Sequence, residues 1–234
     1  MEFIFIDTET TGNEIGKDRL CQVCYRTEKD IRVEYFKPPV PVSVKSMSIT
    51  HITNKMLEDK ESFIGSQMEQ ELQKLLLNGV MVAHNAIFDC AMLQAEGITI
   101  PRYICTLKLA RFLDKECVIP EYNLQFLRYY LDLEVEGEAH DAEGDVNVLH
   151  ALFSRLFQKI KESIFDEQLA INKMIEISST PSLFKKFNFG KYKGQNISEV
   201  ARSDRGYLEW LLKQKLTSEE DEDDWVYTLR ENLK

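Results

Sequence analysis

The sequence lacks any long hydrophobic run. Its longest apolar stretches, such as residues 79–83 and 146–152, are far shorter than the roughly 20 residues that a membrane-spanning helix needs. The first residues also lack the basic start, long apolar middle and small-residue cleavage site of a secretory signal. We therefore expect a cytoplasmic protein that does not insert into a membrane.

Cysteine is scarce, with five residues at scattered positions in a chain of 234. An odd, scattered set does not predict a disulfide framework. Cys21 and Cys24 have C-x-x-C spacing, but no second pair or histidine cluster lies nearby, as a structural zinc site would require. We interpret both as buried strand residues.

Positive charge is also in deficit. The formal net charge of −10 disfavours a general affinity for polyanions. Residues 181–217 are the exception, because they carry eight Lys or Arg side chains against three Asp or Glu. Lysines, aromatic rings and glycines alternate there, a mixture that suits single-stranded nucleic acid. A small structural module whose rings form its own core accounts for the same composition equally well.

The hydrophobic pattern predicts a mixed sheet flanked by helices. The hydrophobic share of 44% and the charged share of 29% are typical of globular proteins. The expected strands are residues 2–6, 19–26, 31–36 and 79–83, and the expected helices are residues 66–77, 106–113, 123–131 and 142–160. Prolines at residues 38–41 begin an irregular arm that runs to Thr53. Strands followed by alternating strands and helices indicate an α/β fold.

The periodicity weakens after about residue 165, which predicts a second, smaller domain. We expect a main domain at residues 1–165 and a linker with a polar helix at residues 166–180. A small C-terminal α/β module is expected at residues 181–234.

Acidic residues follow three separate element junctions. Asp7 and Glu9 are expected to project together past the end of the first strand, because alternate strand residues share a face. Asp89 lies one turn inside the helix after the buried strand, and Asp145 lies in the first turns of the longest helix. Each acid alone is explained by a surface pair or by the helix dipole. Carboxylates held side by side become favourable when a hard divalent cation lies between them, so the combination points to metal chemistry.

The same residues carry a family resemblance. Asp7-x-Glu9, His84-Asn-Ala-x-Phe-Asp89 and His140-x-x-x-x-Asp145 together resemble the three motifs of DEDD-type, DnaQ-like 3′→5′ exonucleases, in the branch whose third motif contains histidine. The resemblance implies a ribonuclease H-like fold, a mixed five-stranded sheet flanked by helices. Segments 41–53, 104–111, 187–194 and 206–211 extend it toward the exonuclease X-like branch, so nearly the whole chain is covered. Asp141 and Glu143 depart from the pattern by adding negative charge to the third motif.

The resemblance implies a two-metal mechanism with two Mg²⁺ or Mn²⁺ ions. Asp7 would bridge the ions, Glu9 and Asp145 would complete the site that holds the attacking water, and Asp89 would support the second ion. His140 would accept a proton from that water, since an imidazole titrates near pH 6.5.

Further residues are expected to contact the substrate strand. They are Thr8, Thr10, His51, Asn85, Phe88, Lys191 and Lys193. His51 corresponds to a position that approaches the terminal nucleotide in similar enzymes, and a turn or capping role is its alternative. Asn85 is also expected to cap the helix that follows it. For Phe88, packing in the hydrophobic core is the favoured interpretation.

The leading hypothesis is a 3′→5′ exodeoxyribonuclease that acts in DNA repair or turnover. It would release nucleoside 5′-monophosphates from DNA, and a single-stranded 3′ end is the expected partner. RNA is the alternative substrate, because no residue visibly excludes a 2′-hydroxyl. A non-catalytic DNA-binding or polymerase-associated subunit is the alternative from another class, and the intact acidic set disfavours it. No membrane partner is expected, and the sequence identifies no protein partner.

Overall fold

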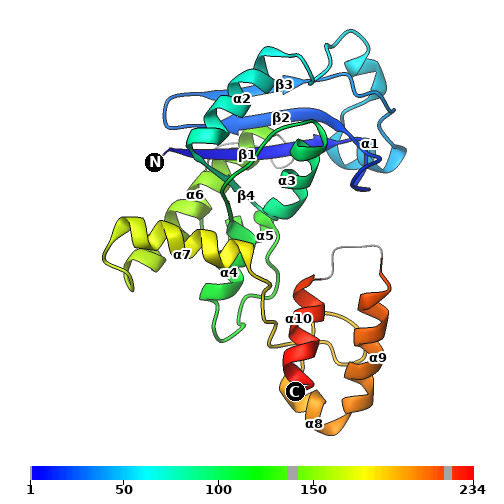
Figure 1. The fold of residues 1–234 in the computed structure, drawn as a ribbon, viewed down its shortest axis with the longest axis vertical. Helices are drawn as coiled ribbons and strands as arrows, with labels where there is room; N and C mark the ends of the chain where they lie inside the picture. Colours follow the sequence, from blue (N-terminus) through cyan, green and yellow to red (C-terminus); the bar gives the residue numbers. More distant parts are fainter. Residues whose placement is uncertain (1, 136–141, 219–222) are drawn as a thin grey trace. The chain divides into compact units, whose positions relative to one another are not determined.

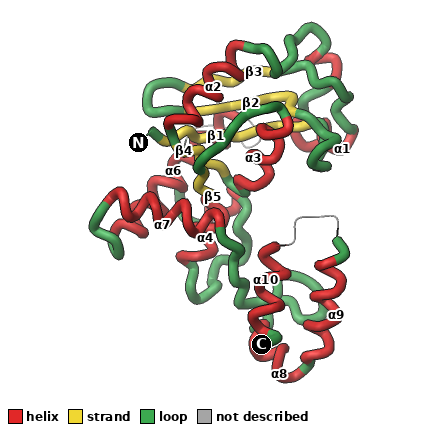
Figure 2. The backbone as a smooth tube through the Cα atoms, viewed as in Figure 1, coloured by secondary structure: helices red, strands yellow, loops and turns green. Residues whose placement is uncertain are grey.

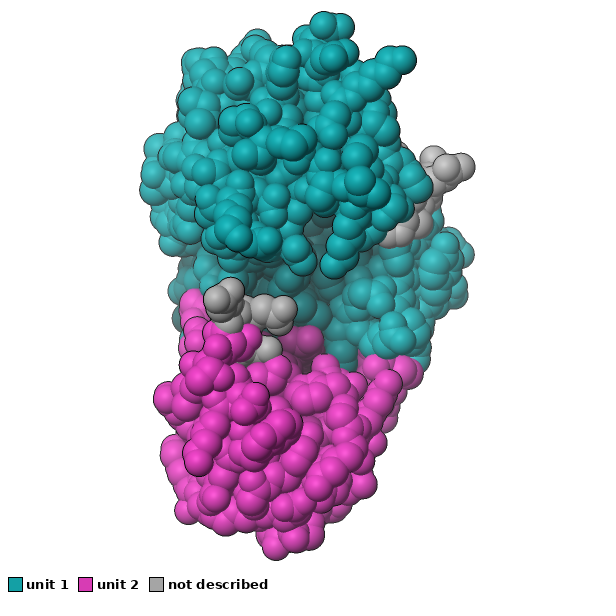
Figure 3. Space-filling model, turned by 90° about the vertical axis from the view of Figure 1, so that its right-hand side faces the viewer, with its two compact units in different colours: residues 1–110, 121–178 teal, residues 111–120, 179–234 magenta. Residues whose placement is uncertain are grey.

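The computed structural model describes residues 2–135, 142–218 and 223–234. The chain divides into two compact units, drawn in separate colours in Figure 3. Unit 1 contains residues 1–110 and 121–178, and unit 2 contains residues 111–120 and 179–234. The domain boundaries inferred from the sequence, at residues 165 and 180, stay a prediction.

Unit 1 is built on a five-stranded mixed sheet of order β3-β2-β1-β4-β5 (Figures 1 and 2). Its strands are β1 (Phe3–Thr10), β2 (Leu20–Arg26), β3 (Ile31–Tyr35), β4 (Val80–Ala83) and β5 (Tyr103–Cys105). The central strand β1 pairs antiparallel with β2 and parallel with β4. The predicted α/β fold with a mixed five-stranded sheet is confirmed. The sequence pattern did not reveal β5, because three residues are too few to show a periodicity.

Helices follow the strands along the chain. In sequence order they are α1 (Val44–Thr50), the 3-10 helix η1 (Asn54–Leu57), α2 (Gln67–Asn78), α3 (Ala86–Ala95), α4 (Thr106–Leu113), α5 (Leu124–Tyr130), α6 (Ala142–Lys161) and α7 (Glu167–Ser179). The arm expected to be irregular contains α1, which begins at an N-cap where the Ser43 side chain accepts a hydrogen bond from the Ser46 N–H. Within the described ranges, no helix is long and apolar enough to cross a membrane.

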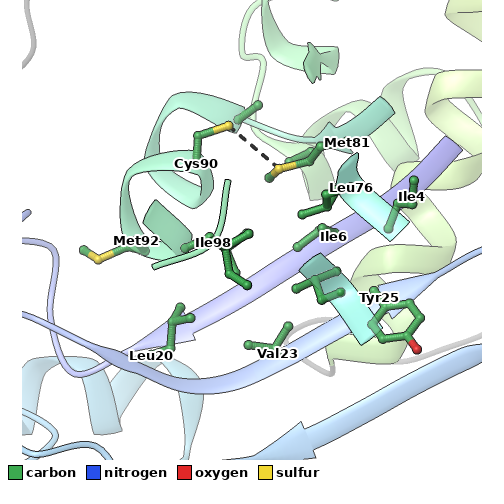
Figure 4. Packing of buried hydrophobic residues seen from close by; sticks show 14 of the residues in the cluster. Ile4, Ile6, Leu20, Val23, Tyr25, Leu76, Met81, Cys90, Met92 and Ile98 are labelled. Carbon is green, nitrogen blue, oxygen red and sulfur yellow. Dashed lines mark hydrogen bonds between the residues drawn. The ribbon is translucent and has the colours of Figure 1, made fainter. Parts of the chain in front are cut away.

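Alternate residues of β1 enter two different packing layers. Ile4 and Ile6 are buried in the core cluster that includes Leu72 and Leu76 of α2 and residues of α3 (Figure 4). Phe3 and Phe5 instead pack against Phe153 of α6, with ring centroids 4.7 Å and 5.3 Å apart. Because strand side chains alternate between faces, Asp7 and Glu9 follow Phe3 and Phe5 toward the side that α6 covers. The β1 pattern therefore aims both carboxylates toward the layer that contains Asp145.

Unit 2 contains α8 (Ile197–Ser203), α9 (Arg205–Leu216) and α10 (Asp223–Asn232). Its core includes Phe187 and Trp225, whose rings stack with centroids 5.7 Å apart. The β pairing of its described part is limited to one isolated antiparallel bridge between Lys186 and Asn196. Gly190 has a φ of +69°, and a Cβ there would lie 2.9 Å from the Tyr207 hydroxyl, so glycine allows this turn to approach the ring.

Candidate active site

Asp7 and Glu9 lie inside β1, where they pair with Cys24 and Gln22 of β2. The expectation that they follow the strand's end was wrong by several residues. The antiparallel ladder with β2 continues to Thr10, so backbone pairing extends the strand through a polar stretch that looks like a loop in the sequence. The ladder holds both carboxylates on a rigid element.

Asp89 lies in the first turns of α3 and is buried, with 5% of its surface exposed. The Thr8 hydroxyl donates a 2.7 Å hydrogen bond to Asp89 Oδ1. Thr8 therefore ties the second acidic motif to β1. Asn85 occupies the N-cap position with a left-handed backbone (φ 63°, ψ 44°), but its side chain makes no capping hydrogen bond. The capping role predicted for the Asn85 side chain was wrong, because the left-handed backbone differs from the extended conformation of an ordinary N-cap.

Asp145 lies in the first turns of α6. The Gln125 side-chain amide, from the first turn of α5, donates a hydrogen bond to Asp145 Oδ1. His140, the expected proton acceptor, lies outside the described residues. Sequence reasoning missed Gln125, because one amide in a short amphipathic helix forms no motif.

The acidic cluster consists of Asp7, Glu9, Asp89 and Asp145. Burial, followed by the charges of Asp89, Glu9 and Asp145, raises the pKa of Asp7 well above its ordinary value. Burial, followed by the charges of Asp145 and Asp89, raises the pKa of Glu9 to about 7. Burial also raises the pKa of Asp89 to about 7, against hydrogen bonds that favour its charged form. The structure thus brings together four acids that lie up to 138 positions apart in the sequence.

The donor chemistry of the acidic cluster fits hard divalent cations. Carboxylate oxygens are the ligands that Mg²⁺ and Mn²⁺ prefer, and positive charge between the acids relieves the repulsion that raises their pKa values. Across residues 2–135, 142–218 and 223–234, no three His, Cys, Asp or Glu side chains form a ready-made metal-binding group. The fit therefore rests on the charge and oxygen chemistry of the cluster rather than on a closed coordination shell.

Three of the expected substrate contacts have other local surroundings. His51 is the exposed C-cap of α1, in a left-handed conformation with φ 59°, and its backbone N–H donates to the Met47 carbonyl. Thr10 uses its hydroxyl to bond the Gly12 carbonyl. Phe88 packs half-buried against the core cluster, as its favoured interpretation predicted.

The two lysines of unit 2 differ from each other. Lys191 pairs with Asp204 at 3.0 Å, and its ammonium also lies over the rings of Tyr192 and Tyr207. Lys193 is exposed. The charge of Lys191 therefore has partners inside its own unit.

Comparison with known proteins gives the class of this fold and site. The chain belongs to the exonuclease family, whose model matches residues 4–153, and is thus a hydrolase of phosphodiester bonds. This family is divalent-metal dependent. Residues 187–215 also match the exodeoxyribonuclease X-like C-terminal family.

Individual relatives agree with this assignment. The chain is 31% identical to exodeoxyribonuclease 10 of Escherichia coli K12 over 214 residues, which cover 88% of this chain and 89% of that protein. It is 30% identical to the DNA polymerase III subunit epsilon of Treponema pallidum, over 66% of this chain and 75% of that protein. A solved exonuclease X in complex with 5′ overhanging duplex DNA matches with a TM-score of 0.60 and 25% identity, over 76% of this chain and 99% of that one. The resemblance inferred from the three acidic motifs is confirmed.

Proposed function

We propose that this chain is a divalent-metal-dependent 3′→5′ exodeoxyribonuclease that releases nucleoside 5′-monophosphates from DNA. The observation that carries the proposal is the acidic cluster, in which the charges of Asp89 on α3 and Asp145 on α6 raise the pKa values of Asp7 and Glu9 on β1. The names of the relatives, an exodeoxyribonuclease and a DNA-bound exonuclease X, support DNA as the substrate. Attack at a 3′ end is part of the proposal.

In this proposal Asp7, Glu9, Asp89 and Asp145 hold two Mg²⁺ or Mn²⁺ ions. When bound, these ions neutralise charge on the scissile phosphate and lower the pKa of the attacking water. Thr8 and Gln125 hold Asp89 and Asp145 in place through the hydrogen bonds described above. His140 accepts the proton of the attacking water.

The direct test is digestion of oligonucleotides with Mg²⁺, Mn²⁺ or EDTA. A 3′-labelled DNA strand should release its label first, as a mononucleotide, whereas a 5′-labelled strand should shorten through a ladder of products. Cleavage should stop in EDTA. Release of the 5′ label first, or cleavage that continues in EDTA, contradicts the proposal. Faster digestion of RNA than of DNA would instead assign the same chemistry to RNA.

We also propose that Lys191 and Lys193 contribute to binding the substrate strand. A Lys193→Glu variant should weaken binding of a single-stranded oligonucleotide and lower its salt dependence by roughly 0.7 in the log–log slope, the value for one lost phosphate contact. Fluorescence anisotropy between 50 and 200 mM salt measures this slope. Lys191→Glu should have an additional structural cost, because it places a carboxylate beside Asp204.

A matched charge change separates a local contact from the effect of net charge. Lys29→Glu alters an exposed lysine between β2 and β3 in unit 1. An equal change in slope for Lys29→Glu and Lys193→Glu would show that Lys193 makes no specific phosphate contact.

The cellular setting is part of the same proposal. Four of the five cysteines, Cys21, Cys24, Cys90 and Cys105, are buried and form no disulfide, as expected where thiols stay reduced. We therefore propose that the enzyme acts in the cytoplasm, in DNA repair or turnover. Recovery of the protein outside the cytoplasmic fraction would contradict the proposed location.

A further inference from the structure

The short helix α5, labelled in Figure 1, carries three aromatic residues, two of which are exposed to solvent. Tyr129 is 73% exposed and Tyr130 is 46% exposed. The ring of Phe126 stacks on that of Tyr130, with centroids 5.7 Å apart and planes inclined by 21°. These three side chains line a shallow surface hollow together with Asn123 and Gln125. We refer to Phe126, Tyr129 and Tyr130 as the α5 aromatic face.

Helix geometry keeps this face away from the core. Residues three and four positions apart lie on one side of a helix, so Phe126 is adjacent to both Tyr129 and Tyr130. Leu127 points elsewhere and is completely buried. The C-terminal end of α5 is also held, because Arg155 of α6 donates a 2.6 Å hydrogen bond to the Leu131 carbonyl. α5 is therefore anchored by its other side, and its rings are not needed to attach it.

The aromatic face is linked to the acidic cluster through one residue, Gln125. Gln125, which precedes Phe126 directly, bonds Asp145. The start of α5 is fixed as well, since His84 Nε2 lies 2.7 Å from the Tyr122 carbonyl oxygen. At a rise of about 1.5 Å per residue, the rings lie within roughly 8 Å of Gln125 along the helix axis. The α5 aromatic face therefore begins directly beside a residue that bonds the acidic cluster.

Positive charge accompanies the rings. The Arg128 guanidinium lies 5.5 Å from the centroid of the Tyr129 ring. Arg155, also near the end of α5, is exposed along its side chain. Rings combined with cations are the composition of single-strand stacking platforms, in which bases stack on aromatic faces while cations balance phosphates. Cations beside exposed rings favour a partner that carries both phosphates and bases over a purely apolar one.

We propose that the α5 aromatic face is a nucleobase-stacking subsite for the substrate strand, next to the nucleotide that is removed. The proposal rests on the exonuclease function proposed above and adds a contact on the base side of the strand. Tyr129 supplies the most accessible ring, and the Phe126–Tyr130 stack supports it on the same face. Bound DNA would then be held by a base as well as by its terminal phosphate.

The test compares two substrates of the same active site. One is a single-stranded DNA oligonucleotide, and the other is the p-nitrophenyl ester of thymidine 5′-monophosphate, which has no neighbouring nucleotide. Tyr129→Ala should lower kcat/KM for the oligonucleotide by about 5- to 100-fold more than for the ester, the range that one base–aromatic stack provides. Phe165→Ala truncates a 95% exposed ring in the α6–α7 connection and is the matched control. It should change kcat/KM by the same factor for both substrates.

Abasic substitutions identify what the ring contacts. In the wild-type enzyme, removing one base near the 3′ end should raise KM at one or two positions. In Tyr129→Ala the same abasic site should add no further loss. The subsite is contradicted if Tyr129→Ala stays fully sensitive to that abasic site, or if it loses no more kcat/KM for the oligonucleotide than Phe165→Ala does. The α5 aromatic face would then serve another contact, such as a protein partner. Failure of the wild type to hydrolyse both substrates would contradict the proposed function instead.

Discussion

Replacing Asp7 with asparagine is expected to lower the hydrolysis rate by at least about a thousandfold, because bound cations supply several kcal/mol of transition-state stabilisation. Asp7 is the member of the acidic cluster whose pKa responds to all three other acids. Asp7→Asn therefore removes the carboxyl that lies within electrostatic reach of every other member of the cluster. Single-turnover digestion of a 3′-labelled DNA strand, with saturating Mg²⁺ or Mn²⁺, measures the effect.

The same substitution should stabilise the metal-free protein above neutral pH. Burial and like charges raise the pKa of Glu9 from 4.5 to about 7, and burial raises the pKa of Asp89 from 3.8 to about 7. A carboxyl whose pKa is higher in the folded state favours folding below its unfolded-state pKa, and this contribution is lost as pH rises to about 7. The Tm of the metal-free wild type should therefore fall between pH 4.5 and pH 8, and Mg²⁺ should restore it most at pH 8.

Asp7→Asn removes one of the interacting charges. The Tm of this variant should therefore fall less than the wild-type Tm over the same pH interval, and Mg²⁺ should raise it less. Asp59→Asn is the matched control, since Asp59 is an exposed acid in the same unit. A wild-type Tm that rises from pH 4.5 to pH 8 without metal would contradict the electrostatic account. Near-normal hydrolysis by Asp7→Asn would contradict its place in the metal site.

The sequence predicted those strands of the sheet that consist mainly of hydrophobic residues. β4 is apolar throughout and β2 is apolar except for Gln22 and Arg26, and both lie where the pattern placed them. β1 was predicted too short, because its second half is polar from Asp7 to Thr10. Pairing with β2 keeps that half extended while its carboxylates converge with other acids. A local pattern does not contain this long-range contribution.

The acidic cluster was accessible from the sequence for a chemical reason. Each acid alone has an ordinary explanation, as a surface pair or as a partner of the helix dipole. A D-x-E pair on a strand together with acids at the starts of two helices is uncommon, and this combination made the cluster recognisable. The supporting residues carry no such signal. Gln125 is recognised only through its bond to Asp145, and the pairing of Lys191 with Asp204 depends on a turn that its own sequence does not specify.

His140→Ala is expected to lower the turnover rate by about 10²- to 10⁴-fold, the usual contribution of a general base. The residue lies outside the described part of the chain, so the prediction rests on the third motif and on the place of Asp145, five positions later, at the start of α6. In the proposal this histidine accepts a proton from the attacking water. Because its imidazole is not an acidic ligand, metal binding should persist, and Mg²⁺ should still raise the Tm of the variant.

The pH profile distinguishes a proton acceptor from a structural histidine. An imidazole accepts a proton only when neutral, so the wild-type rate should rise as pH passes its pKa, near 6.5 for an unperturbed side chain. His140→Ala should lose this rise while keeping the Mg²⁺-dependent increase in Tm. The comparison is His51→Ala, which alters an exposed histidine at the end of α1. As an expected substrate contact it should affect KM, but the rise of kcat with pH should persist. A His140→Ala enzyme with near-normal turnover and an unchanged profile would show that another group accepts the proton.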